Sequence, residues 1–101
     1  MDQQGIKLDL DQDRIRTILK EAYEVCKDLL EADFYLTREE FVAKIDPYLN
    51  SNRISTVVGL HLQSYKYPEL VIEVDLRRKK MISRLANKKV QVHLNRFLTK
   101  L

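Results

Sequence analysis

The sequence predicts an α+β fold dominated by helices, in which three N-terminal helices precede a two-stranded β element. Apolar side chains recur at three- and four-residue spacing between residues 11 and 32, as on one face of an amphipathic helix. Only two glycines and two prolines occur in 101 residues, fewer than strand-rich folds with many tight turns require. Alternating apolar and polar residues over Leu70–Leu76 and Val90–Asn95 predict the two strands.

The first helix is predicted over about Asp11–Ala32, preceded by a flexible arm of residues 1–10. Asp9, Asp11 and Asp13 cluster at its start, where negative charge and capping oxygens suit the free N–H groups. At ~1.5 Å per residue the helix is ~30 Å long. The residues expected on its buried face are Ile15, Ile18, Leu19, Ala22, Cys26, Leu29 and Leu30.

A second helix is predicted to follow Thr37, after a short extended piece at 34–36. Thr37 and Glu40 have the spacing of a capping box, in which each side chain bonds the other residue's backbone N–H. Pro47 disfavours helical geometry at Asp46 and is expected to split this helix or force a turn. Phe41, Val42, Ile45 and Leu49 are expected to face inward.

A third helix is predicted over Asn52–Tyr65, after turn-forming residues at 50–52. The alternative is a strand over Val58–Gln63, because that stretch alternates. The helix is favoured because its apolar pattern is longer. The inward face of this helix would comprise Ile54, Val57, Val58, His61, Leu62 and Tyr65.

The two predicted strands are joined by a basic connection at 77–89. An alternative places one helix over 69–86, which makes the fold an all-α bundle; β-branched residues and strict alternation favour strands. Met81, Ile82 and Leu85 are apolar within this connection and predict a short packed helix or a homodimer contact. The predicted core contains Ile15, Leu19, Cys26, Leu30, Phe41, Ile45, Val58, Leu62, Ile72 and Val92.

This order of elements resembles the winged helix-turn-helix arrangement over roughly residues 14–98, within a single binding domain of residues 11–101. The resemblance implies that the third helix enters the DNA major groove and that the loop between the last strands contacts the phosphate backbone. The third-helix residues that would point toward DNA are Arg53, Ser55, Thr56, Gln63 and Lys66. The wing would consist of Arg77, Arg78, Lys79, Lys80, Arg84, Lys88 and Lys89.

The charge is unevenly distributed along the chain. Residues 1–50 carry twelve acidic and seven basic side chains, a net charge of −5, whereas residues 51–101 carry three acidic and eleven basic, a net charge of +8. No acidic residue follows Asp75, although nine basic ones do. Such a stretch repels itself unless a polyanion or an acidic partner neutralises it. Tyr65 and Tyr67 also flank Lys66, an aromatic–basic interleaving found where bases stack, although core packing is the commoner role of a tyrosine.

No pattern of catalysis, cofactor binding or metal binding is present. Cys26 is the only cysteine, so a zinc site of four Cys or His ligands within the chain and an internal disulfide are excluded, and a reducing, cytoplasmic location is expected. His61 and His93 are isolated and are expected to be structural. The N-terminus has no apolar run, so no signal peptide is expected. The longest apolar stretches are four residues or fewer, so no membrane span is expected.

The expected function is therefore non-enzymatic binding of nucleic acid, in particular duplex DNA, through a basic C-terminal face, as a regulatory or replication and recombination accessory. The alternative is a protein–protein adaptor or modulator of a larger complex, of the kind that phages and plasmids encode. In that case the oppositely charged halves serve self-association or docking on an acidic protein. One continuous positive face favours nucleic acid, whereas scattered basic residues favour protein.

Overall fold

The computed structural model describes residues 12–49, 57–67 and 69–99, so the predicted arm of residues 1–10 lies outside the described part. The elements are α1 (Gln12–Leu30), α2 (Arg38–Ala43), α3 (Asp46–Leu49), β1 (Val57–Leu62), β2 (Leu70–Asp75), β3 (Lys80–Arg84) and α4 (Lys88–Leu98). The strands form one antiparallel sheet in the order β1-β2-β3. The α+β class is confirmed, but this sheet has three strands where the sequence predicted two.

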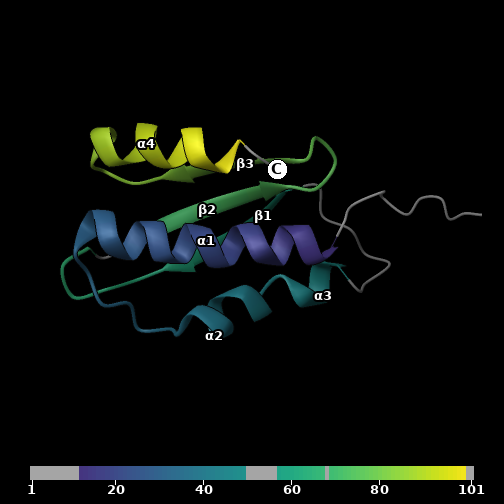
Figure 1. The fold of residues 1–101 in the computed structure, drawn as a ribbon, viewed down its shortest axis with the longest axis horizontal. Coiled ribbons are helices and arrows are strands. Elements are labelled where there is room, and N and C mark those ends of the chain that lie inside the picture. The colour runs from purple at the N-terminus through teal and green to yellow at the C-terminus, as the bar shows by residue number, and fades with distance from the viewer. Residues whose placement is uncertain (1–11, 50–56, 68, 100–101) are drawn as a thin grey trace, which may run out of the picture.

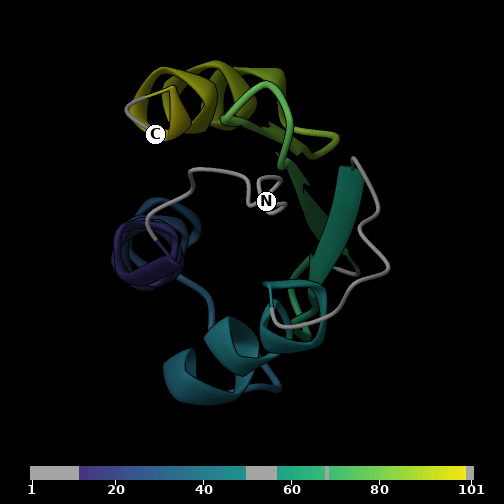
Figure 2. The same cartoon turned by 90° about the vertical axis from the view of Figure 1, so that its right-hand side faces the viewer.

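The helices close around one face of the sheet. Viewed from the end in Figure 2, the sheet forms one wall and α1 lies opposite it. Helix α4 packs against β3 and α1, while α2 packs against α1 and β1. Figure 1 shows the same arrangement from the side, with α4 along one edge of the molecule and α2 and α3 along the other. The apolar face of every strand therefore points into one enclosed core.

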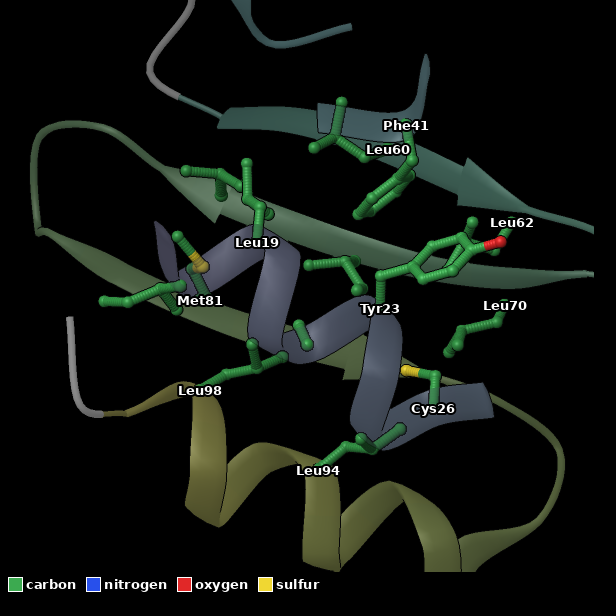
Figure 3. Close-up of a cluster of buried hydrophobic side chains, with 14 of the residues drawn as sticks. Leu19, Tyr23, Cys26, Phe41, Leu60, Leu62, Leu70, Met81, Leu94 and Leu98 are labelled. Carbon is green, nitrogen blue, oxygen red and sulfur yellow. The ribbon is translucent and has the colours of Figure 1, made fainter. Parts of the chain in front are cut away.

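The core contains side chains from α1, the sheet and α4, which meet in Figure 3. Along β1 the buried and exposed residues alternate strictly, and on β2 the alternate residues are fully buried. Nine of the ten predicted core residues are buried, and Val92 is wrong because its side chain is 54% exposed. The nine are Ile15, Leu19, Cys26, Leu30, Phe41, Ile45, Val58, Leu62 and Ile72.

The two N-terminal helices are confirmed, but Leu29, predicted on the buried face of the first helix, is 39% exposed. Helix α1 ends at Leu30, and Glu31 follows with a left-handed φ of 49°, the conformation that often terminates helices. The capping box is formed: the Glu40 N–H donates to Thr37 Oγ1 at 3.1 Å, and the Thr37 N–H donates to Glu40 Oε1 at 2.9 Å. The second helix is split before Pro47, which lies in the first turn of α3, where its missing N–H has no cost.

The third helix predicted over Asn52–Tyr65 is wrong across its described part, residues 57–65, where β1 forms instead. Strand β1 pairs with β2 so that Val58 lies opposite Val74 and Leu62 opposite Leu70. A helix would have buried Val57, but this side chain is 49% exposed. The alternative strand prediction was correct because this stretch fits both periods, and a neighbouring strand supplied the backbone partners.

The strand predicted over Val90–Asn95 is also wrong, since these residues belong to α4. The Asn87 side chain caps the helix by accepting the N–H groups of Lys89 and Val90 at 3.1 and 3.2 Å. Leu94 and Leu98, four residues apart, enter the core, and Val92 faces away from it. The predicted connection at 77–89 instead contains β3. The single helix over 69–86 and the all-α bundle are wrong, and the winged-helix arrangement is not confirmed.

Helix α4 is attached to β3 by a polar contact around Ser83, a fully buried residue. The Ser83 N–H donates to Asn95 Oδ1 at 2.6 Å, and its hydroxyl donates to the same oxygen at 2.9 Å. The Gln91 side-chain amide donates to the Ser83 carbonyl at 2.9 Å. Two side chains of α4 thus form hydrogen bonds with the backbone N–H, the carbonyl and the hydroxyl of Ser83 on the edge strand β3. Met81 on the same strand is fully buried, so it packs in the core of its own chain rather than in either the short helix or the homodimer contact that the sequence predicted.

Replacing Asn95 by Leu should lower the free energy of unfolding by about 1–3 kcal/mol, because the buried Ser83 N–H and hydroxyl lose their acceptor while the branched shape of the side chain is kept. Urea unfolding measured by circular dichroism tests this. The control is His93→Ala on the exposed side of α4, which should change stability by less than about 0.5 kcal/mol. Equal stabilities of the two variants would show that the Ser83 contact does not hold α4.

Candidate nucleic-acid interface

The turn between β2 and β3 exposes four consecutive basic residues. Its backbone is held by Asp75, whose Oδ1 accepts the N–H groups of Arg77 and Arg78 at 3.1 and 3.0 Å. We call this turn the hairpin tip; its four side chains are all exposed. It consists of Arg77, Arg78, Lys79 and Lys80.

Lys79 has a backbone conformation that favours glycine. Its φ is 53°, in the left-handed region where few residues with a side chain occur. Glycine adopts this conformation without steric cost, so folding alone favours glycine here. The chain carries an exposed ammonium group at this position instead.

The outer face of α4 is also basic. Gln91, Leu94, Asn95 and Leu98 turn toward β3 and the core. Helical geometry then directs the side chains on the opposite side of the helix outward, where they are exposed, whereas Phe97 is partly buried against the core. This outer face consists of Lys88, Lys89, Val92, His93 and Arg96.

Lys88 and Lys89 stand at the electrostatically unfavourable end of α4. They occupy the first turn, which contains no acidic residue. The N-terminus of a helix carries a partial positive charge, so a cation there costs about 0.3–1 kcal/mol at an exposed site. An anion bound at this place would be attracted by both lysines and by the positive end of the helix dipole.

The hairpin tip and the outer face of α4 lie along one side of the molecule. A connection of only three residues, 85–87, joins β3 to α4, so the helix runs back beside the strand. In Figure 1 the last turn of α4 therefore lies at the same end of the molecule as the β2–β3 turn. We name the combined surface the basic band; it comprises Arg77, Arg78, Lys79, Lys80, Lys88, Lys89, His93 and Arg96.

Most cations of the basic band lack a counter-charge. Arg78 approaches Asp75 at 4.0 Å, while the other arginines and lysines of the band form no ion pair within the described residues. By contrast, Arg16 pairs with Asp46 at 3.0 Å and Arg38 with Glu39 at 2.9 Å on the N-terminal helices. The positive charge that the sequence concentrates after Asp75 is therefore left uncompensated on one surface.

Several residues predicted for the site lie elsewhere. Arg84 is paired with Glu73 on the open face of the sheet, and Gln63 and Lys66 belong to the β1–β2 connection rather than to a helix. Arg53 and Thr56 lie outside the described residues. His93 and Arg96 were missed, although the seven-residue spacing from Lys89 to Arg96, with Leu94 and Leu98 on another face, is a helical signal.

A shallow hollow on the open face of the sheet is the other polar feature. His61 Nδ1 contacts the Glu69 carboxylate, and Arg84 contacts Glu73. The lining contains two carboxylates and one arginine, so the hollow has no excess of positive charge to attract a polyanion. The hollow is lined by Gly59, His61, Glu69, Val71, Glu73, Arg84, Leu85, Ala86 and Gln91.

Cys26 is not exposed as a nucleophile. It is buried in α1, and burial raises the pKa of its thiol to about 12, so the thiol stays protonated at neutral pH. Among the described residues, no group of three or more His, Cys, Asp or Glu side chains is placed to hold a metal ion. None of the helices formed by these residues has the length and apolar character needed to cross a membrane.

Comparisons with protein-family models, with curated proteins and with solved structures return no match for this chain.

Replacing Lys88 and Lys89 together by Glu should raise the free energy of unfolding by about 1 kcal/mol, because two carboxylates then face the positive end of α4. Thermal and urea unfolding of the purified protein measure the change. Lys20→Glu, in the middle of α1, is the control and should give no gain. A loss of stability in the double variant would mean that the two lysines support the helix.

Proposed function

We propose that the protein binds duplex DNA through the basic band, as a non-enzymatic binding protein that requires no cofactor or metal. One observation carries the proposal: exposed cations without ion pairs stand where folding alone favours other residues. Lys79 replaces a favoured glycine, and Lys88 and Lys89 oppose the helix dipole. Residues that lower stability in this way are typical of functional surfaces.

The hairpin tip is proposed to contact the phosphate backbone. Four adjacent cations on a rigid turn give a high local positive charge, and each phosphate that they neutralise releases condensed counterions. The sequence predicts the same phosphate contact for a wing of residues 77–89, and the proposal assigns it to Arg77–Lys80. Such contacts position the protein on DNA without reading its sequence.

The outer face of α4 is proposed to lie along the major groove. The helix has 11 residues, a length of ~16 Å, and a groove about 12 Å wide admits an α-helix. Arg96 has the guanidinium that binds guanine through two hydrogen bonds, and Val92 offers an apolar contact for a thymine methyl group. The element proposed to read base edges is therefore α4, in place of the helix that the sequence predicted over residues 52–65.

Changing the four basic residues of the hairpin tip to Ala should weaken DNA binding equally on all sequences. The slope of log affinity against log salt concentration should flatten by ~0.9 for each lost phosphate contact. Fluorescence anisotropy with a labelled duplex at several salt concentrations measures both quantities. These side chains are exposed, so the fold should be kept.

The matched control removes Lys20, Lys27 and Lys44, which are exposed on α1 and beside α2, and should leave the slope unchanged. If both variants lose affinity alike, binding depends on net charge alone and the basic band is not the interface. If the wild-type protein binds no duplex at low salt, the proposal is wrong, and an acidic protein partner becomes the remaining explanation of the band.

Replacing Arg96 by Ala should change the preferred DNA sequence, because a contact with a base edge discriminates by about 1–3 kcal/mol. Selection from a library of random duplexes before and after the change measures the preference. Lys80→Ala, at the hairpin tip, should weaken binding without altering the selected sequence. An unchanged preference in the Arg96 variant would remove α4 from base reading.

A further inference from the structure

Two tyrosines are exposed at the other end of the sheet. Tyr65 is 89% and Tyr35 55% exposed. Their ring centroids are 4.9 Å apart with an angle of 83° between the planes, an edge-to-face pair. Tyr65 therefore keeps most of its side chain available to solvent while its ring contacts that of Tyr35.

The chain holds Tyr65 at the tip of a tight turn. The Ser64 N–H donates to the Tyr67 carbonyl and the Tyr67 N–H donates to Ser64 Oγ, both at 2.9 Å. Ser64 is only 4% exposed, so the turn is anchored in the domain. Its two central residues, Tyr65 and Lys66, are exposed at its end.

Tyr35 is fixed from the opposite side. Its N–H donates to the Gln63 carbonyl at 2.9 Å, and the preceding Phe34 forms an isolated bridge with Ser64. Phe34 packs edge-to-face on the buried Tyr23, with ring centroids 5.4 Å apart. Because hydrogen bonds fix the backbone of Tyr35 and close the turn that carries Tyr65, a partner that stacks on them has little backbone entropy to remove.

A cation accompanies the pair. Lys66 follows Tyr65 directly, and its ammonium group lies 5.6 Å from the centre of the Tyr67 ring. Lys66 forms no ion pair within the described residues. An exposed ring beside an uncompensated cation is the combination that single-stranded nucleic acid requires, with stacking for the base and positive charge for its phosphate.

We propose that Tyr35, Tyr65 and Lys66, the aromatic tip, bind an unpaired nucleotide of a single-stranded segment that extends from the bound duplex. This inference rests on the proposed duplex binding and adds a class of substrate, DNA with a single-stranded overhang. The six residues of β2 separate the aromatic tip from the hairpin tip, a distance of ~20 Å. An overhang of about six nucleotides at 3.4 Å each spans it.

The test compares three labelled ligands that share one duplex: a blunt duplex, the duplex with an eight-nucleotide overhang, and the duplex with an abasic overhang of equal length. Both overhang polarities are measured by anisotropy at one salt concentration. The full overhang should bind roughly 5- to 100-fold more tightly than the abasic one, the range expected for stacking one base. The abasic overhang controls for added phosphate charge.

Tyr65→Ala should remove this gain and leave blunt-duplex affinity unchanged, whereas Tyr65→Phe, which keeps the ring, should retain it. Circular dichroism verifies that each variant is folded. A two-nucleotide overhang, too short to reach the aromatic tip, should bind like the blunt duplex.

The results separate this inference from the duplex proposal. Wild-type binding to the blunt duplex with no preference for the full over the abasic overhang overturns the inference alone, and leaves the tyrosines to a protein partner. The eight-nucleotide strand alone is a further ligand: binding to it that Tyr65→Ala abolishes, without duplex binding, supports the aromatic tip and removes the duplex proposal. Binding to none of the ligands overturns both.

Discussion

The contact of Ser83 with the amide side chains of Gln91 and Asn95 determines which residues of the C-terminal segment face solvent. An edge strand presents unpaired N–H and C=O groups, and on β3 the two amides satisfy those of Ser83. Because Gln91 and Asn95 lie one helical turn apart, forming both contacts sets the rotation of α4 about its axis. Leu94 and Leu98 are then directed into the core. Lys89 and Arg96 then lie on the exposed side of the helix. The buried polar contact at Ser83 therefore determines which charged side chains of α4 face solvent.

The two halves of the chain use charge in different ways. On the N-terminal helices the arginines meet carboxylates, as Arg16 meets Asp46 and Arg38 meets Glu39. Burial of the large apolar face of α1 supplies much of the stability there. In the described C-terminal half most cations other than Arg78 and Arg84 form no ion pair, and these include two lysines at a helix N-terminus and one in a left-handed conformation. The core therefore offsets the cost of a surface that electrostatics and backbone geometry disfavour.

The antiparallel sheet places two different chemistries at opposite ends of one rigid element. Strand β2 begins beside the turn that carries Tyr65 and ends beside the hairpin tip. Hydrogen bonds to β1 and β3 on both sides keep it straight and extended. The separation of the aromatic tip and the hairpin tip is thus a property of the fold, and both proposed contacts are pre-positioned before any ligand arrives.

The sequence by itself determined the elements whose signals are local. Helix α1 has a long amphipathic period, Thr37 and Glu40 form their capping box within one turn, and Pro47 interrupts the helix on steric grounds. The sequence also predicted β2 and the cationic stretch from Arg77 to Lys80. The alternation of apolar and polar residues and the charge of the side chains can both be seen in the sequence without knowing any distant contact.

Only the tertiary structure decided β1, β3 and α4. Val57–Leu62 fits both a helix and a strand, and pairing with β2 made it a strand. The apolar alternation of Val90, Val92 and Leu94 imitates a strand, but the Asn87 cap and the Ser83 contact make it a helix that exposes Val92. The hairpin tip was therefore predictable, whereas the outer face of α4 was not. A short segment with two possible periods takes its conformation from the backbone and side-chain partners that the rest of the fold brings to it.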